Sequence, residues 1–164
     1  MKKGKLKKYN ACSKEDKEPE ADDSTYINTT LDFEIRNKEK KDLLSGENSL
    51  TYDDIDVVYY QKGKEKVYDN PLALDGRKGY VILRYWDGKY LDTKYVHLYL
   101  NEPSKRSENI AYTYLRISGR PELYTFKVEY KTGEDYVEVQ KVYLNGVLFW
   151  PTETGSIPVI TIPD

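Results

Sequence analysis

The chain has 164 residues, of which 33% are charged and 38% are hydrophobic, and its formal net charge at neutral pH is −2. This near-neutral balance predicts no nucleic-acid partner, because binding to a phosphate backbone depends on a surplus of Lys and Arg. A single Cys and a single His exclude an intramolecular disulfide and a zinc site built from several Cys and His ligands, and we expect no cofactor.

Residues 1–25 differ in composition from the rest of the chain. They contain seven lysines and six acidic residues but few apolar side chains. Such a segment cannot bury enough apolar surface to offset the entropy lost on ordering. We therefore expect a disordered, charged leader over residues 1–25 and a single folded domain over residues 26–164.

From Tyr26 onward, apolar and polar residues alternate with a period of two, which is typical of half-buried β-strands. Leu31, Phe33 and Ile35, for example, are separated by charged residues. The alternation predicts strands over residues 31–36, 55–61, 80–86, 94–100, 110–118, 123–131, 136–144, 147–150 and 159–162. Residues 37–50 have too few apolar members for a helix, and we predict a loop there.

The clearest turn signal is Asn145-Gly146, which lies between two apolar segments. Both residue types accept the positive φ angles of a type I′ turn, so they predict a β-hairpin. Strands spaced by roughly 8–12 residues favour two packed sheets over a parallel α/β fold. We predict an all-β protein, namely an immunoglobulin-like antiparallel β-sandwich of seven to nine strands with a disordered N-terminal leader.

The 17 tyrosines provide the candidate binding surface. Alternation places three polar or aromatic residues on one face of the strand over 94–100 and three on one face of the next strand. These six residues are Tyr95, His97, Tyr99, Tyr112, Tyr114 and Arg116. Because consecutive strands usually pair, we expect one contiguous patch that faces solvent and binds a glycan or a protein.

Two other interpretations of these six residues remain open. Cross-strand tyrosine pairs stabilise a sheet without binding any ligand, by a few tenths to about 1 kcal/mol for each pair. Alternatively, the tyrosine side of the strand is the buried one, and Val96 and Leu98 face the solvent.

The sequence favours a protein that is not an enzyme. Asp53, Asp54 and Asp56 lack the spacing of a calcium-binding loop, so we predict a solvated strand entrance and no metal site. His97 lies within an alternating strand, and there is no Gly-x-Ser-x-Gly segment for a nucleophilic serine. A glycoside hydrolase is the third hypothesis, since its two carboxylates are recognised only by their separation in space.

The leader carries a possible anchor. Lysines at the start followed by Ala11-Cys12 resemble a bacterial lipoprotein signal, in which the cysteine receives the lipid. Cys12 and the acidic residues after it are similar to the start of mature surface lipoproteins of Bacteroidetes-type bacteria. No apolar segment of 7–15 residues separates Lys3 from Cys12. A start that differs from the native one, or a cytoplasmic protein, is therefore the alternative.

The body of the chain supports the same resemblance. Residues 31–37 and the closing segment 141–150 resemble small uncharacterised lipoproteins of that group. The resemblance implies an immunoglobulin-like sandwich, an outer-membrane-anchored location in the cell envelope, and no catalytic residues. Our leading expectation is a non-enzymatic lipoprotein domain that binds a protein or glycan partner and meets the membrane only through its lipid. The second is a structural spacer domain of a surface complex. The sequence determines neither the ligand nor the oligomeric state.

Overall fold

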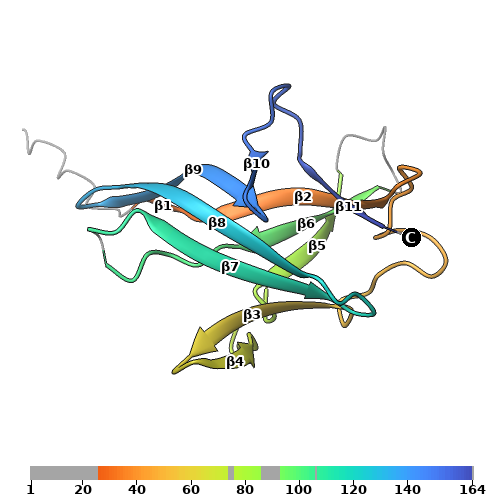
Figure 1. Cartoon of the computed structure of the whole chain (residues 1–164), viewed down its shortest axis with the longest axis horizontal. Coiled ribbons are helices and arrows are strands. Elements are labelled where there is room, and N and C mark those ends of the chain that lie inside the picture. The colour runs from red at the N-terminus through yellow and green to blue at the C-terminus, as the bar shows by residue number, and fades with distance from the viewer. Residues whose placement is uncertain (1–25, 74–75, 86–92, 106, 164) are drawn as a thin grey trace, which may run out of the picture.

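The computed structural model describes residues 26–73, 76–85, 93–105 and 107–163, and within these ranges the chain forms eleven β-strands and no helix. The strands make two sheets that pack together as a β-sandwich (Figure 1). The all-β sandwich expected from the alternating pattern is confirmed. The predictions made for the leader, including disorder and a lipid on Cys12, lie outside the described residues.

The larger sheet has seven strands. Along its main path these are β1 (Tyr26–Asn28), β9 (Tyr136–Leu144), β8 (Leu123–Thr132), β7 (Ile110–Ile117), β3 (Ile55–Gln61) and β4 (Lys64–Val67). The seventh strand, β10 (Val147–Trp150), pairs with β9. All neighbours are antiparallel except β1, which runs parallel to β9.

The smaller sheet has four strands in the order β11 (Val159–Ile162), β2 (Thr30–Asn37), β6 (Lys94–Tyr99) and β5 (Tyr80–Arg84). Here β11 runs parallel to β2, and the other pairs are antiparallel. The described part of the chain thus has more strands than the seven to nine predicted, and it contains two parallel pairs. The two extra strands, β1 and β4, are short and fully exposed, so no burial imposes the alternation that would reveal them.

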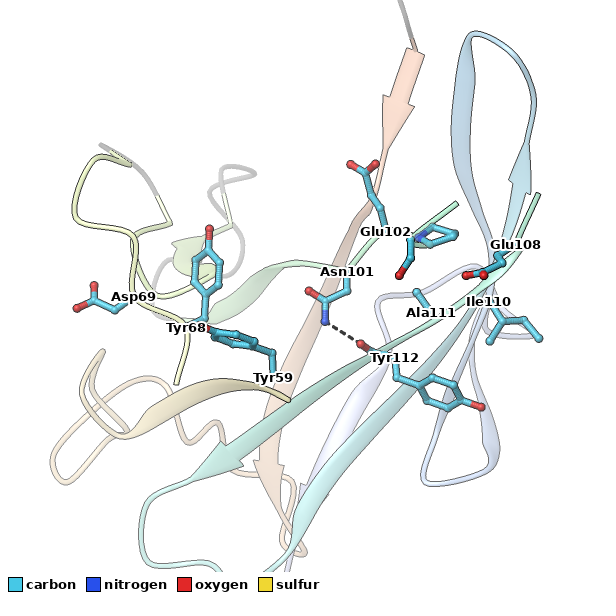
Figure 2. A pocket seen from close by; sticks show the side chains of 11 residues that line it. Tyr59, Tyr68, Asp69, Asn101, Glu102, Glu108, Ile110, Ala111 and Tyr112 are labelled. Carbon is cyan, nitrogen blue, oxygen red and sulfur yellow. Dashed lines mark hydrogen bonds between the residues drawn. The ribbon is translucent and has the colours of Figure 1, made fainter. Parts of the chain in front are cut away.

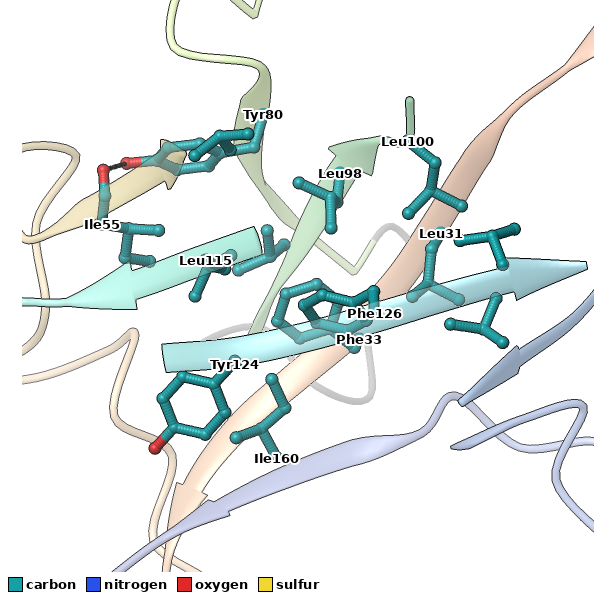
Figure 3. Packing of buried hydrophobic residues seen from close by; sticks show 14 of the residues in the cluster. Leu31, Phe33, Ile55, Tyr80, Leu98, Leu100, Leu115, Tyr124, Phe126 and Ile160 are labelled. Atoms are coloured by element: carbon teal, nitrogen blue, oxygen red, sulfur yellow. Dashed lines mark hydrogen bonds between the residues drawn. The ribbon is translucent and has the colours of Figure 1, made fainter. Parts of the chain in front are cut away.

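The hydrophobic core lies between the two sheets. In β2, Leu31, Phe33 and Ile35 point inward and are almost completely buried. From the larger sheet, Leu115 and Phe126 meet them, as Figure 3 shows. The inward side chains of both sheets come from alternate positions of each strand, so the two-residue period of the sequence follows from this single shared core.

Two hairpins close with two-residue turns. Asn145 and Gly146 have φ angles of 49° and 87°, as the predicted type I′ turn requires. Lys62 and Gly63, between β3 and β4, have φ angles of 52° and 75°. The second turn was not predicted, because lysine is not a residue that favours positive φ.

Strand β3 separates from β7 towards its C-terminal end. The two strands pair only from Ile55 to Val58, opposite Ile117 to Tyr114. Beyond this point β3 continues beside β4 and moves away from β7 (Figure 1). This divergence leaves a space at one end of the sandwich, which the next section describes.

Candidate functional site

The space beside the diverging strands is a hollow of about 600 Å³, within the range of small-ligand sites. Three tyrosines line it, namely Tyr59, Tyr68 and Tyr112. Figure 2 shows Tyr59 and Tyr68 at one end and Tyr112 at the other. We call this feature the tyrosine hollow.

Four separate segments of the chain form the tyrosine hollow. Tyr59 belongs to the part of β3 that no longer pairs with β7, and Tyr68 follows β4. Tyr112 belongs to the first half of β7. The connection from β6 to β7 contributes Asn101 and the residues after it. Only folding brings these segments together, because they span more than 50 residues of the sequence.

Asn101 holds the wall of the tyrosine hollow in place. Its backbone N–H donates to the Thr113 hydroxyl at 2.9 Å, and its side-chain amide donates to the Tyr112 carbonyl at 2.7 Å (Figure 2). Its own carbonyl accepts a hydrogen bond of 2.6 Å from the Tyr130 hydroxyl. Burial raises the pKa of Tyr130, so this hydroxyl stays protonated and donates at neutral pH. These three bonds tie the connection to the sheet.

The charged groups of the tyrosine hollow are acidic. Its lining includes Asp69, Glu102 and Glu108. Asp69 accepts hydrogen bonds of 2.6 and 3.1 Å from the Arg77 guanidinium, which holds the pKa of its carboxyl below the usual value. The two glutamates are exposed to solvent. Tyrosine rings beside carboxylates and an amide form a surface that offers both apolar contact and hydrogen-bond acceptors.

The six residues predicted as one binding patch lie on two different sheets. Tyr95, His97 and Tyr99 are in β6 of the smaller sheet, whereas Tyr112, Tyr114 and Arg116 are in β7 of the larger sheet. The expected contiguous patch is therefore wrong, because the connection from β6 to β7 crosses from one sheet to the other instead of pairing the strands. Whether either group binds a ligand stays a prediction.

The prediction of which side of each strand faces outward is confirmed. Val96 and Leu98 are completely buried, while Tyr99 on the other side is 40% exposed. The alternative in which the tyrosines line the core is thereby ruled out for β6. In β7 the same holds, because Leu115 is buried and Tyr112 is 46% exposed.

On the outer face of the smaller sheet, the side chains bond mainly to each other. His97 Nδ1 lies 2.6 Å from Asp32 Oδ1, its cross-strand neighbour in β2. The Tyr99 ring meets the His97 ring edge to face at 5.2 Å. Tyr85 packs on Tyr95 at 5.0 Å between ring centroids. These contacts agree with tyrosine pairs that stabilise the sheet.

Glu34 adds a buried charge to this outer face. Its carboxylate accepts a hydrogen bond of 2.7 Å from the Tyr85 hydroxyl and forms an ion pair with Arg36. Burial, together with the bond to Glu34, raises the pKa of Tyr85. The carboxylate is only 10% exposed, so its compensation by Arg36 and Tyr85 is what makes its burial tolerable.

On the outer face of the larger sheet, three tyrosine rings form a row. Tyr112 and Tyr114 stack with their ring centroids 6.4 Å apart, and Tyr60 meets Tyr114 edge to face at 5.2 Å. Arg116 Nη2 lies 2.6 Å from Glu65 Oε1 in β4. Of the six predicted residues, Tyr112 also lines the tyrosine hollow within the described residues.

The acidic cluster near the start of β3 is internally neutralised. Lys78 Nζ lies 3.2 Å from Asp53 and 3.9 Å from Asp56. Asp54 accepts hydrogen bonds of 2.7 Å from the backbone N–H and the hydroxyl of Thr51, which lower the pKa of its carboxyl. The cluster therefore closes a turn before β3. In the described ranges, no group of three or more His, Cys, Asp and Glu residues is arranged to hold a metal ion.

Sequence reasoning missed Tyr59, Tyr68 and Asn101. Their positions carry no local signal, because their proximity depends on where β3 leaves β7. No helix in the described segments is long and apolar enough to cross a membrane. No protein-family model, curated protein or solved structure matches this chain. The resemblance to Bacteroidetes-type lipoproteins therefore stays a prediction from the sequence.

Proposed function

We propose that this domain is a non-enzymatic binding module that takes a glycan in the tyrosine hollow. The observation that carries the proposal is the meeting of three tyrosines and three carboxylates in one cavity of about 600 Å³. A sugar ring has apolar C–H faces and a rim of hydroxyls. Tyrosine rings supply apolar contact at low entropic cost, and carboxylates and amides accept or donate the hydrogen bonds of the rim.

The charge of the tyrosine hollow favours a neutral glycan over an anionic partner. Asp69, Glu102 and Glu108 would repel a phosphate or a sulfate, while their oxygens accept hydrogen bonds from sugar hydroxyls. Glu102 and Glu108 are exposed, whereas the general acid of a glycoside hydrolase needs a setting that raises its pKa. The exposed setting favours binding over hydrolysis.

The proposal predicts that removing a tyrosine ring from the tyrosine hollow weakens glycan binding. Wild-type protein is first tested against an array of neutral glycans, and the best ligand is then titrated by calorimetry. Tyr68→Ala and Tyr112→Ala should each raise the Kd about tenfold or more, which corresponds to ~1.4 kcal/mol. Tyr26→Ala is the matched control, because Tyr26 is 55% exposed and lies in β1 outside the tyrosine hollow.

Two results would contradict this function. The first is that no glycan binds, or that Tyr26→Ala weakens binding as much as the other two variants; a spacer domain would then be the better explanation. The second is turnover of the bound glycan that Glu102→Gln or Glu108→Gln abolishes while the fold is kept. That outcome would replace the binding module by a hydrolase.

We further propose that the domain is attached to the cell envelope through a lipid on Cys12. The support is the sequence around Cys12 together with the absence of any second cysteine that could carry the label. When the full native gene is expressed in its bacterial host with a labelled fatty acid, the protein should incorporate the label and sediment with membranes. Cys12→Ser should lose both properties. An unlabelled wild-type protein in the cytosolic fraction would refute this location.

A further inference from the structure

A second hollow, of about 450 Å³, lies at the other end of strand β6. The tyrosine hollow adjoins the chain just after β6, while this second hollow is lined by Lys94, the first residue of that strand. Lys41, Ser45 and Arg84 are also in its lining. We call it the basic hollow, because three of its side chains are cations.

Arg84 and Lys94 face each other across two paired strands. They are direct partners in the register of β5 and β6, so they lie on the same face with their Cβ atoms about 4.5–5.5 Å apart. Like charges in this arrangement destabilise a sheet. A bound anion would remove this repulsion.

The third cation comes from the loop after β2. Lys41 is held by Asn37, whose side-chain oxygen accepts a hydrogen bond of 2.8 Å from the Lys41 backbone N–H. In return, the Asn37 N–H donates to the Lys41 carbonyl at 3.1 Å. The turn therefore brings Lys41 back to the end of the smaller sheet where β6 begins (Figure 1).

The one carboxylate of the lining does not neutralise these cations. Asp42 accepts backbone hydrogen bonds from Leu44 at 2.9 Å and from Lys94 at 3.2 Å, one to each of its oxygens. Among the residues that the structure describes, no carboxylate lies within ion-pair distance of the Lys41, Arg84 or Lys94 side chains. The positive charge of the basic hollow is thus left uncompensated in this part of the protein.

Ser45 adds a polar group that also lacks a partner within the described residues. Its hydroxyl oxygen is buried, and none of these residues forms a hydrogen bond with it. Buried hydroxyls are normally paired, because an unpaired one costs about 1–3 kcal/mol. A hydroxyl at the wall of a basic cavity is well suited to donate to an oxygen of an anion.

We propose that the basic hollow binds an oxyanion, namely the phosphate or sulfate group of a small ligand. Arg84, Lys94 and Lys41 supply the positive charge, and the Ser45 hydroxyl supplies a hydrogen bond. A cavity of about 450 Å³ has room for more than the ion, since cavities from roughly 300 Å³ upward hold small organic ligands. This site is independent of the tyrosine hollow, and its anion would be repelled by the acidic lining there.

The inference is tested with inorganic sulfate and inorganic phosphate as probes. The full chain is ¹⁵N-labelled and titrated at constant ionic strength against sodium chloride, so that general screening is the same throughout. Saturable amide shifts are expected for residues 41–46, 84 and 93–94. Arg84→Gln and Lys94→Gln should each weaken the ion at least tenfold. Lys66→Gln, which removes an exposed cation from β4, should leave the affinity unchanged.

A second readout separates loss of binding from loss of fold. Sulfate should raise the Tm of the wild type above its value in chloride, and it should raise the Tm of Arg84→Gln much less. In chloride, Arg84→Gln should melt no lower than the wild type, because the repulsion between Arg84 and Lys94 is gone. Comparison of inorganic phosphate with glucose 6-phosphate then shows whether the site takes the free ion or the phosphate group of a larger molecule.

The inference would be overturned by shifts that do not saturate, by shifts spread over lysines of the whole surface, or by an equal effect of Lys66→Gln. Failure here would not touch the glycan proposal. The tyrosine variants Tyr68→Ala and Tyr112→Ala report on the other end of β6 and should bind sulfate as the wild type does.

Discussion

Phe33→Ala should lower the free energy of unfolding by about 3–5 kcal/mol, the usual cost of removing a large aromatic side chain from a core. Phe33 is completely buried, and it links the two sheets. Its ring lies 5.6 Å from that of Phe126 in the larger sheet and 6.2 Å from that of Phe149 in β10. Loss of the ring leaves a cavity where three strands meet, and urea denaturation followed by tryptophan fluorescence measures the result.

The matched control for this variant is Tyr26→Ala. Tyr26 is also aromatic but 55% exposed, so its removal should change the free energy of unfolding by no more than about 0.5 kcal/mol. Because a domain is stable by only about 5–15 kcal/mol, Phe33→Ala should also shift the denaturation midpoint strongly. A loss below about 1 kcal/mol for Phe33→Ala would contradict the packing of the two sheets around these three rings.

Tyr80→Phe should destabilise the protein by about 1–3 kcal/mol at neutral pH, because it leaves buried carbonyls without a donor. Tyr80 is completely buried in the core. Its hydroxyl donates to the Tyr52 carbonyl at 2.6 Å and lies 3.2 Å from the Ile55 carbonyl (Figure 3). These bonds fasten the first residue of β5 in the smaller sheet to the start of β3 in the larger sheet.

The same residue should give the protein a characteristic response to alkaline pH. Burial raises the pKa of Tyr80 above its ordinary value, which is about 10 in an unfolded chain. The native state therefore retains a proton that the unfolded state releases. Its contribution to stability is complete below about pH 10 and falls as the pH rises above it, by up to ~1.4 kcal/mol per pH unit.

Denaturation of the wild type and of Tyr80→Phe is compared at about pH 8 and about pH 11, on either side of the ordinary tyrosine pKa. The difference in the free energy of unfolding should shrink at the higher pH, because the variant has no hydroxyl at this position that could ionise in the unfolded state. Tyr26→Phe, at an exposed position, should follow the wild type at both values. A difference between wild type and Tyr80→Phe that stays constant with pH would show that the Tyr80 hydroxyl ionises equally in both states.

Most strands were predictable because alternation is a local property. In β2, β7 and β8, one face of each strand is buried along its length, so the sequence repeats with the period of the pleat. The turn at Asn145-Gly146 was predictable for a similar reason, since positive φ is a property of the residue types themselves. Strand β4 was missed because both of its faces are exposed.

The candidate site was predictable only in part. The outward direction of Tyr112 follows from alternation, and it is correct. The grouping of Tyr99 with Tyr112 required β6 and β7 to pair, and they do not, because they belong to different sheets. The tyrosine hollow itself depends on the point at which β3 leaves β7, and no residue type in β3 marks that point.

Local patterns in the amino-acid sequence were therefore sufficient for the strands, their inward faces and one tight turn, because each depends on neighbouring residues and on burial of one side. Which strands pair, and which side chains meet at the ends of the sandwich, was decided by the folded chain alone. Arg84 and Lys94 illustrate the difference, since each is an ordinary surface cation in the sequence. They become a site for an anion only when β5 and β6 place them opposite each other.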